Sequence, residues 1–118
     1  MEAADGIIVG IPVYYGSATP QIMALLDRAA YVSMRWGGSL RRKAGAAIAV
    51  ARRAGANFTF AQLNYFFLYN EMIMQGSTSW NVAYGWGLED VKKDEEGLQT
   101  VWNMASNMAW LLKKLHGR

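Results

Sequence analysis

The side chains most often used in catalysis are scarce in this sequence. It contains no cysteine, which excludes a thiolate nucleophile, a disulfide and an iron–sulfur cluster held by this chain. Its one histidine, His116, lies two residues before the end, which argues against a histidine-based triad and a multi-histidine metal site. A terminal histidine of this kind favours the negative end of a helix dipole. The sequence therefore predicts no catalytic residue and no metal site.

Aromatic, glycine and arginine residues are instead gathered in three short stretches. The first is "PVYYGS", residues 12–17, which follows an apolar run and carries two adjacent tyrosines. The second is the arginine-containing "ARRAGAN", residues 51–57. The third is "STSWNVAYGWGLED", residues 77–90, which is longer than most connections and therefore suggests a functional role. Its large aromatic residues are Trp80, Tyr84 and Trp86.

The segments around these stretches predict an α/β fold. Gly6–Ile11 and Lys43–Ala51 are apolar throughout, which is typical of strands covered on both faces, and residues 71–76, "EMIMQG", predict a short third strand. A helical pattern follows each strand. The order β-α-β-α-β-α, with right-handed crossovers, predicts a parallel sheet with helices on both faces.

Each predicted helix has a start signal. Thr19 with Pro20 begins the first helix, Asn57 caps the second, and Asp94 opens the third. The first helix ends at Gly37-Gly38 and the second near Asn70. The predicted apolar stripe of the third helix consists of Leu98, Val101, Trp102, Ala105, Met108, Ala109, Leu112 and Leu115, and the helix ends at Lys113, Lys114 and Gly117.

The second predicted helix, residues 57–70, is apolar nearly all round. One interpretation is that one of its faces meets another subunit. The alternative is that both faces lie inside this one domain. The strand Gly6–Ile11 also forms an apolar sheet edge, so we expect a homo-oligomer, most simply a dimer.

Composition limits the remaining classes of protein. The length of 118 residues suits one domain, and a hydrophobic content of 53% is typical of a globular protein. No apolar stretch reaches about 18 residues, so no membrane span is expected. The acidic start "MEAADG" argues against a secretory signal, so a cytoplasmic location is expected. The net charge of +3 is too small for a nucleic-acid-binding stripe.

Several separated motifs together resemble one known family. "ADGIIVGIPVYYGSATPQIMALLDR", "GAAIAVARRAG", "NYFFLYNEMIMQG" and "DEEGLQT" are similar to the NADPH-dependent FMN reductases with a flavodoxin-like fold, and most similar to the iron–sulfur flavoprotein branch. The resemblance covers nearly all 118 residues. It implies a partial flavodoxin-like fold of three layers, with a parallel sheet between helices. The strands of this chain correspond to strands 3, 4 and 5 of the family's strand order 2-1-3-4-5.

The resemblance also implies the residues of a flavin site. The family's flavin loop falls on Pro12, Val13, Tyr14, Tyr15, Gly16 and Ser17, where aromatic rings lie along the isoalloxazine and glycine admits backbone amides. A second flavin-flanking segment falls on Ala51, Arg52, Arg53 and Gly55. Alanines replace several family glycines there, which puts close backbone approach in doubt. Alternatives to a role in flavin binding stay open for each stretch. The tyrosines could merely cover a sheet edge, and the arginines could be solvated loop charges. The aromatic residues of the third loop could form a lid over the flavin, a contact with another subunit, or a surface without a role.

The sequence departs from the family at its start. The first two βα units are expected to be missing, about 60 residues at about 30 per unit, so residues 1–118 would form one flavodoxin-like domain without them. The family's phosphate loop and the clustered cysteines of the iron–sulfur branch belong to that part.

Two functions follow from the resemblance. The first is a flavin-dependent NAD(P)H oxidoreductase with weakened FMN binding, which needs no acid–base residue because the cofactor carries the hydride chemistry. NAD(P)H and a small-molecule electron acceptor would be its partners, without nucleic acid or membrane. The second is a non-catalytic remnant or split half that acts by subunit association. Flavin absorbance of the purified protein discriminates between them.

Overall fold

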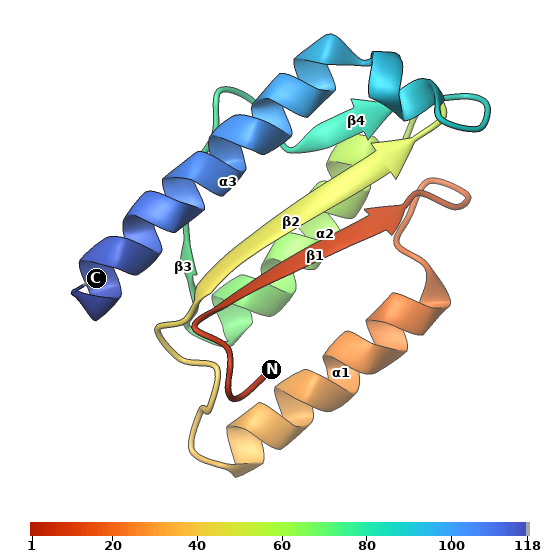
Figure 1. Cartoon of the computed structure of the whole chain (residues 1–118). Coiled ribbons are helices and arrows are strands. Elements are labelled where there is room, and N and C mark those ends of the chain that lie inside the picture. Colours follow the sequence, from red (N-terminus) through yellow and green to blue (C-terminus); the bar gives the residue numbers. More distant parts are fainter. Residues whose placement is uncertain (118) are drawn as a thin grey trace.

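The structure, a computed structural model that describes residues 1–117, is built around strand β2 (Ala44–Ala51). Strand β1 (Gly6–Pro12) pairs in parallel with β2 along its length, with Gly6 opposite Ala44. On the other side of β2 lie two short parallel strands, β3 (Ile73–Met74) at its start and β4 (Val82–Tyr84) at its end (Figure 1). The predicted α/β fold with a parallel sheet is confirmed.

Small side chains allow β2 to occupy the centre. Its alanines at positions 44, 46, 47, 49 and 51 are buried. A Cβ atom on Gly45 would lie 2.6 Å from Cδ1 of Phe67, so a larger residue there would displace that ring. Helices can therefore approach the strand closely from both faces.

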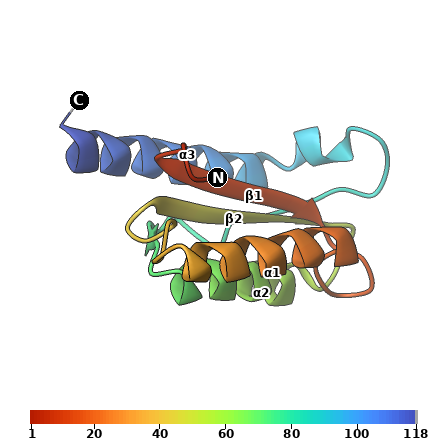
Figure 2. The ribbon, with the colours of Figure 1, turned by 90° about the horizontal axis from the view of Figure 1, so that it is seen from below.

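The helices form two layers around the sheet. Helices α1 (Pro20–Arg35) and α2 (Ala56–Tyr69) cover one face, and α3 (Glu95–His116) covers the other (Figure 2). A short 3₁₀ helix, η1 (Asp90–Lys93), precedes α3. The main core lies beneath α1 and α2, and a smaller one lies beneath α3. No helix within residues 1–117 is long and apolar enough to cross a membrane.

The prediction that both faces of the first strand are covered is wrong at Ile8. Ile7, Val9 and Ile11 point into the main core, whereas Ile8 is 49% exposed. The reason is the position of α3, which packs on β2 and β4. Within residues 1–117, β1 pairs only with β2 and is an edge of the sheet.

The third predicted strand, residues 71–76, is confirmed only as the two-residue β3, and a further short strand, β4, follows it. The chain leaves the sheet after Met74 and returns at Asn81, whose side-chain amide donates to the Ala47 carbonyl oxygen (3.1 Å). The Ala49 amide in turn donates to the Asn81 carbonyl oxygen (3.0 Å). β4 therefore lies inside the stretch expected to be a loop. It has only three residues and turn-forming residues on both sides, so the sequence pattern did not indicate a strand.

The helix start signals are right at two of three positions. The Thr19 hydroxyl accepts a hydrogen bond from the Ile22 amide (3.4 Å), and the Asp94 carboxylate accepts one from the Gly97 amide (3.0 Å). Asn57 is wrong as a cap. The second helix begins at Ala56, after Gly55 in the left-handed conformation (φ 86°), without a side-chain cap.

The predicted stripe of α3 is partly wrong. Met108 is buried as expected and Val101 and Leu112 are half-buried, but Trp102 is 69% exposed. Leu98 and Leu115 are also exposed, as are Ala105 and Ala109. The buried ridge consists of Gly97, Thr100, Met104 and Met108. Gly97 shifts the ridge because a Cβ atom there would lie 3.0 Å from Cα of Ala83, so the helix packs on β4 through this glycine.

Candidate functional site

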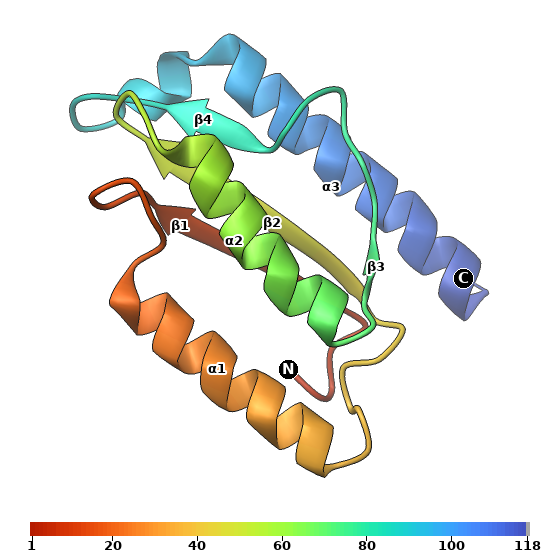
Figure 3. The ribbon, with the colours of Figure 1, turned by 180° about the vertical axis from the view of Figure 1, so that it is seen from behind.

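Three loops meet beyond the carboxyl ends of β1, β2 and β4 (Figures 1 and 3). They correspond to the first and second stretches singled out above and to the end of the third. Ligands of open parallel sheets bind at this end, because connecting loops and helix N-termini converge there. The loop cluster is therefore the candidate site.

The first loop is a tight turn. The Tyr14 amide donates to the Ser17 carbonyl oxygen (3.1 Å), and the Ser17 amide donates back to Tyr14 (3.2 Å). The two central residues, Tyr15 and Gly16, both have positive φ (49° and 79°). This conformation holds the Tyr15 side chain fully in solvent, while Tyr14 is 60% exposed.

The base of this loop is anchored to the sheet. Pro12 ends β1, and the Val13 amide donates to the Val50 carbonyl oxygen (2.8 Å). The Val13 side chain packs against the buried Ala51 and Ala56. Pro12, Val13 and Ala51 therefore support the loops, and the tyrosines are the residues presented outward.

The first two loops touch at a pair of glycines. A Cβ atom on Gly55 would lie 2.6 Å from Cα of Gly16 and 3.1 Å from Cγ1 of Val13. Gly55 also has a positive φ of 86°. Gly55 thus lets the backbones of the first two loops approach each other closely.

The second and third loops meet through Arg52. Its guanidinium lies over the ring of Trp86, a cation–π contact. The Gly85 amide donates to the Ala51 carbonyl oxygen (3.0 Å), which brings the backbones of the two loops together. Arg53 is exposed beside them. Trp80 lies at the opposite, amino-terminal end of β4, away from Trp86.

Asp90 holds the third loop in place. Its carboxylate accepts hydrogen bonds from the Gly87 amide (2.7 Å) and from Nζ of Lys93 (2.8 Å). The hydrogen bond from Lys93, assisted by the Gly87 amide, lowers the pKa of Asp90 below its usual 3.8. Sequence reasoning missed this residue, although an acid followed three residues later by a lysine is a visible signal.

Asp94 is a second supporting residue whose full role was missed. Besides capping α3, its carboxylate accepts a hydrogen bond from the Tyr84 amide (2.7 Å). One side chain thus joins the end of β4 to the start of α3.

The site offers backbone donors as well as aromatic surface. Among the hydrogen bonds of residues 1–117, the amides of Tyr15, Gly16, Arg52 and Arg53 donate to no protein acceptor. The start of α2 has no side-chain cap either. Exposed amides, two arginines and aromatic rings together suit a flat ligand with a polar, electron-rich edge.

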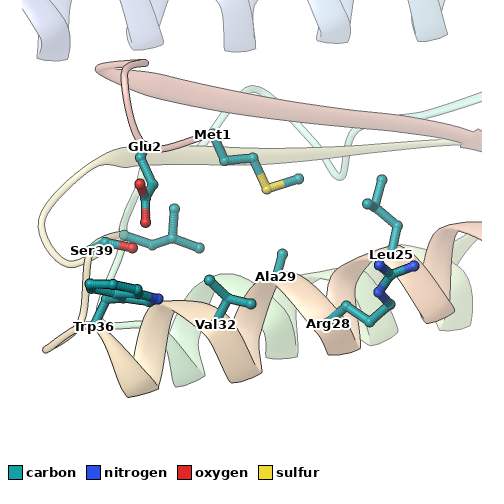
Figure 4. A pocket seen from close by; sticks show the side chains of 9 residues that line it. Met1, Glu2, Leu25, Arg28, Ala29, Val32, Trp36 and Ser39 are labelled. Carbon is teal, nitrogen blue, oxygen red and sulfur yellow. The ribbon is translucent and has the colours of Figure 1, made fainter.

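A separate groove of about 800 Å³ lies along α1 (Figure 4). Its lining includes Met1 and Glu2 from the start of the chain, Leu25 and Val32 from α1, and Trp36 directly after that helix. It shares no lining residue with the three loops, and its walls are mainly apolar. We place the candidate site at the loops, because ligands of open parallel sheets bind at the carboxyl ends of the strands and this groove lies along α1.

Most of the chain matches the model of a known protein family. Residues 1–87, which include the first two loops and the third as far as Gly87, match the family model of NADPH-dependent FMN reductases. The chain belongs to this family. The resemblance stated from the sequence motifs is thereby confirmed.

Curated relatives of this FMN reductase family member are iron–sulfur flavoproteins. One from Methanocaldococcus jannaschii is 38% identical over 120 residues, covering 96% of this chain and 61% of the relative. One from Methanosarcina thermophila is 34% identical over 115 residues, covering 96% of this chain and 59% of the relative. The chain therefore spans about six tenths of the length of these flavoproteins.

Solved structures confirm the flavodoxin-like fold. A flavodoxin, WrbA-like protein from Agrobacterium tumefaciens superposes with a TM-score of 0.78 at 17% identity, covering 96% of this chain and 69% of that one. A flavone reductase superposes with a TM-score of 0.66 at 19% identity, covering 99% and 46%. At such identities the similarity concerns the fold alone.

Proposed function

We propose that this chain supplies the ring-binding part of an FMN site in a flavin-dependent oxidoreductase. The observation that carries the proposal is the contact between Gly16 and Gly55, which joins two loops of an FMN reductase family member beside the Arg52–Trp86 pair. In this proposed role, the whole protein uses NAD(P)H as its electron donor and a small molecule as its electron acceptor.

The residues at the loops fit a flavin ring. The isoalloxazine is flat and apolar in its centre, with carbonyl oxygens and nitrogens along one edge. Tyr14, Tyr15 and Trp86 are exposed aromatic side chains that can contact such a plane. The amides of Tyr15 and Gly16, which lie in a turn with positive φ at both residues, can donate to its polar edge.

Each group has a separate part in the proposed site. A bound flavin supplies the hydride and electron transfer chemistry. Arg52 and Arg53 stabilise negative charge on the bound ring. The pair of glycines sets the spacing of the loops, and the Asp90–Lys93 pair holds the segment that carries Trp86.

A non-catalytic role in association is the second candidate. It is favoured by the open edge of β1 and the apolar groove along α1, which lie outside the three loops. In this case the chain acts by completing a larger assembly and binds little or no flavin by itself.

A titration with two flavins tests the proposal. The 118-residue chain is mixed with riboflavin and, separately, with FMN, and flavin fluorescence is followed. Because the proposed contacts reach the ring and not the phosphate, we expect similar, weak affinities of about tens of micromolar, or about −6 kcal/mol. Trp110→Ala, which removes an exposed aromatic side chain of α3, is the control and should leave both affinities unchanged.

Two outcomes would contradict this account. Absence of binding for both flavins would leave the association role as the better candidate. Nanomolar binding of FMN without binding of riboflavin would show that a group such as Arg52 or Arg53 holds the phosphate, and the ring-only site would be wrong.

A further inference from the structure

One side chain of α2 reaches the first loop of the candidate site. Oε1 of Gln62 accepts a hydrogen bond from the backbone amide of Ala18 (2.9 Å), although the two residues are 44 positions apart in the sequence. Ala18 lies between the turn at Tyr14–Ser17 and the start of α1. Gln62 therefore links α2 to the segment through which the chain leaves the loop.

The amide of Ala18 depends on this acceptor. Ala18 is 5% exposed and belongs to the main core, so its N–H group cannot reach water unless the chain moves. Within residues 1–117, Gln62 is the one acceptor of this amide. A buried donor without an acceptor is costly, because it has given up its hydrogen bond to water and gained none. Loss of the Gln62 carbonyl group would therefore favour a displaced exit of the loop.

The first loop is held differently at its two ends. At its entry, the Val13 amide donates to the Val50 carbonyl oxygen (2.8 Å), which continues the pairing of β1 with β2. At its exit, a side chain of α2 holds the backbone instead. Between the two ends, Tyr14 and Ser17 exchange two backbone hydrogen bonds, so the turn moves as one unit. Fixing both ends therefore fixes the direction in which the turn presents its exposed groups.

The loop also contacts α2 at a second point. Gly55, directly before the helix, approaches Gly16 within the turn. Gln62 follows seven residues later, which is about 10 Å further along the helix at 1.5 Å per residue. Two contacts at this separation prevent the loop from rotating about either one. The start of α2 is thus the support on which the first loop rests.

We infer that Gln62 is a positioning residue of the flavin site, holding the first loop in the orientation that its contacts with the ring require. The inference rests on the proposed function, because the loop is the part of the site assigned to the flavin ring. Gln62 acts through the Ala18 amide, so it needs no contact with the flavin. Glutamine suits this part because its carbonyl group reaches a backbone amide from a half-buried position without bringing in a charge.

Two variants of Gln62 separate the acceptor from the size of the side chain. Gln62→Met keeps a similar length and removes the carbonyl group, whereas Gln62→Glu keeps an acceptor oxygen. Gln99→Met is the matched control, because Gln99 is exposed on α3 and its amide donates to Asn103 (2.9 Å). Asp27 lines the same hollow as Gln62, so measurements at physiological ionic strength screen it from the new carboxylate.

Backbone NMR of the flavin-free chain measures the position of the loop. In Gln62→Met, the amide signals of Tyr15 and Gly16 should shift, and the Ala18 amide should exchange with solvent about tenfold faster, the factor for loss of one hydrogen bond. Gln62→Glu should resemble the wild type, and Gln99→Met should change neither property. Unchanged Tyr15 and Gly16 signals in Gln62→Met would overturn the inference.

The riboflavin titration measures the consequence for the site. Gln62→Met should bind riboflavin about tenfold more weakly than the wild type, and Gln62→Glu should recover most of this loss. Circular dichroism at the titration temperature shows that each variant is folded, so a loss of affinity is separate from a loss of stability. A merely structural role would lower the melting temperature of Gln62→Met and leave its affinity unchanged.

The outcomes distinguish the inference from the proposed function. If the wild type binds flavin and the folded Gln62→Met variant binds it equally well, the inference alone is overturned. Failure of Gln62→Glu to recover affinity would also overturn it, because the acceptor oxygen would not be the cause. If the wild type binds neither flavin, the proposed function fails, and the part of Gln62 in flavin binding fails with it.

Discussion

At the scale of single residues, two glycines decide where the candidate site lies. Gly16 and Gly55 are separated by 39 positions in the sequence, yet their backbones touch. Gly55 has a positive φ as well, so both the space and the backbone conformation exclude a larger residue. The tyrosines beside them play a different part, because they contribute exposed surface and little packing.

We expect Gly55→Ala to destabilise the protein by about 1–3 kcal/mol, since alanine adds both strain and a clash with Gly16. Urea unfolding measures this change. Gly76→Ala is the control, because a Cβ atom there meets nothing within 4 Å and should cost little. Equal stability of the two variants would contradict the proposed loop contact.

Tyr15→Ala should show the opposite pattern. Because this side chain is fully exposed, its removal should leave the free energy of unfolding within about 0.5 kcal/mol of the wild type. If flavin contacts the first loop, the same change should weaken flavin affinity several-fold. An unchanged affinity in the fluorescence titration would place the flavin elsewhere.

The carboxyl group of Asp90 gives a prediction about pH. Its pKa lies below 3.8 in the folded chain, so its hydrogen bonds stabilise the third loop above that pH and are lost as the pH falls through the folded pKa. NMR titration of the carboxyl carbon should give a midpoint below 3.8. In Lys93→Ala the midpoint should move upward, because the largest cause of the shift is removed. A midpoint that does not move would show that Lys93 is not its main partner.

At the scale of secondary structure, the end of β4 and the start of α3 depend on one side chain. Asp94 accepts hydrogen bonds from Tyr84 on the strand and from Gly97 on the helix. A helix cap that also binds a neighbouring strand fixes the position of the helix over the sheet. It thereby sets the length and course of the loop that carries Trp86.

Asp94→Ala should therefore reduce the free energy of unfolding by about 1–2 kcal/mol, at the upper range for loss of a helix cap. Asp94→Asn should recover only the part due to the helix cap, because asparagine has one acceptor oxygen for Gly97 and its NH2 group cannot accept from the Tyr84 amide. Urea unfolding and the near-ultraviolet circular dichroism of the tryptophans measure both effects. If the alanine variant were as stable as the asparagine variant, the cap would have no structural role.

At the scale of the whole molecule, the sheet has an open side. β1 pairs only with β2 among residues 1–117, and Ile8 is half-exposed on the face that α3 leaves free. Exposed strand edges promote association between chains.

Ile8→Lys should reduce aggregation without unfolding the chain. A charge on an edge strand opposes edge-to-edge pairing, and the exposed position tolerates lysine. Static light scattering at increasing protein concentration measures the effect. Leu98→Lys, which removes a comparably exposed apolar side chain from α3, should have a smaller effect. Equal reductions would mean that general hydrophobicity, not the strand edge, drives association.

The sequence by itself determined the kinds and order of the helices and strands except β4. Continuous apolar runs identify β1 and β2, and the signals at Thr19 and Asp94 place the starts of two helices, because these features depend on residues close together in the chain. The motif resemblance correctly indicated the FMN reductase family and the flavodoxin-like fold. The sequence also identified the first two stretches and the end of the third, which meet at one end of the sheet.

Only the tertiary structure decided how these parts fit together. The cap at Asn57 failed because Gly55 takes the left-handed conformation that its contact with Gly16 requires. The stripe of α3 shifted because Gly97 packs on β4, and β4 itself exists because β2 offers it a partner. The pairing of Arg52 with Trp86 likewise depends on residues 34 positions apart. Each of these outcomes depends on contacts between distant segments, which local residue patterns do not encode.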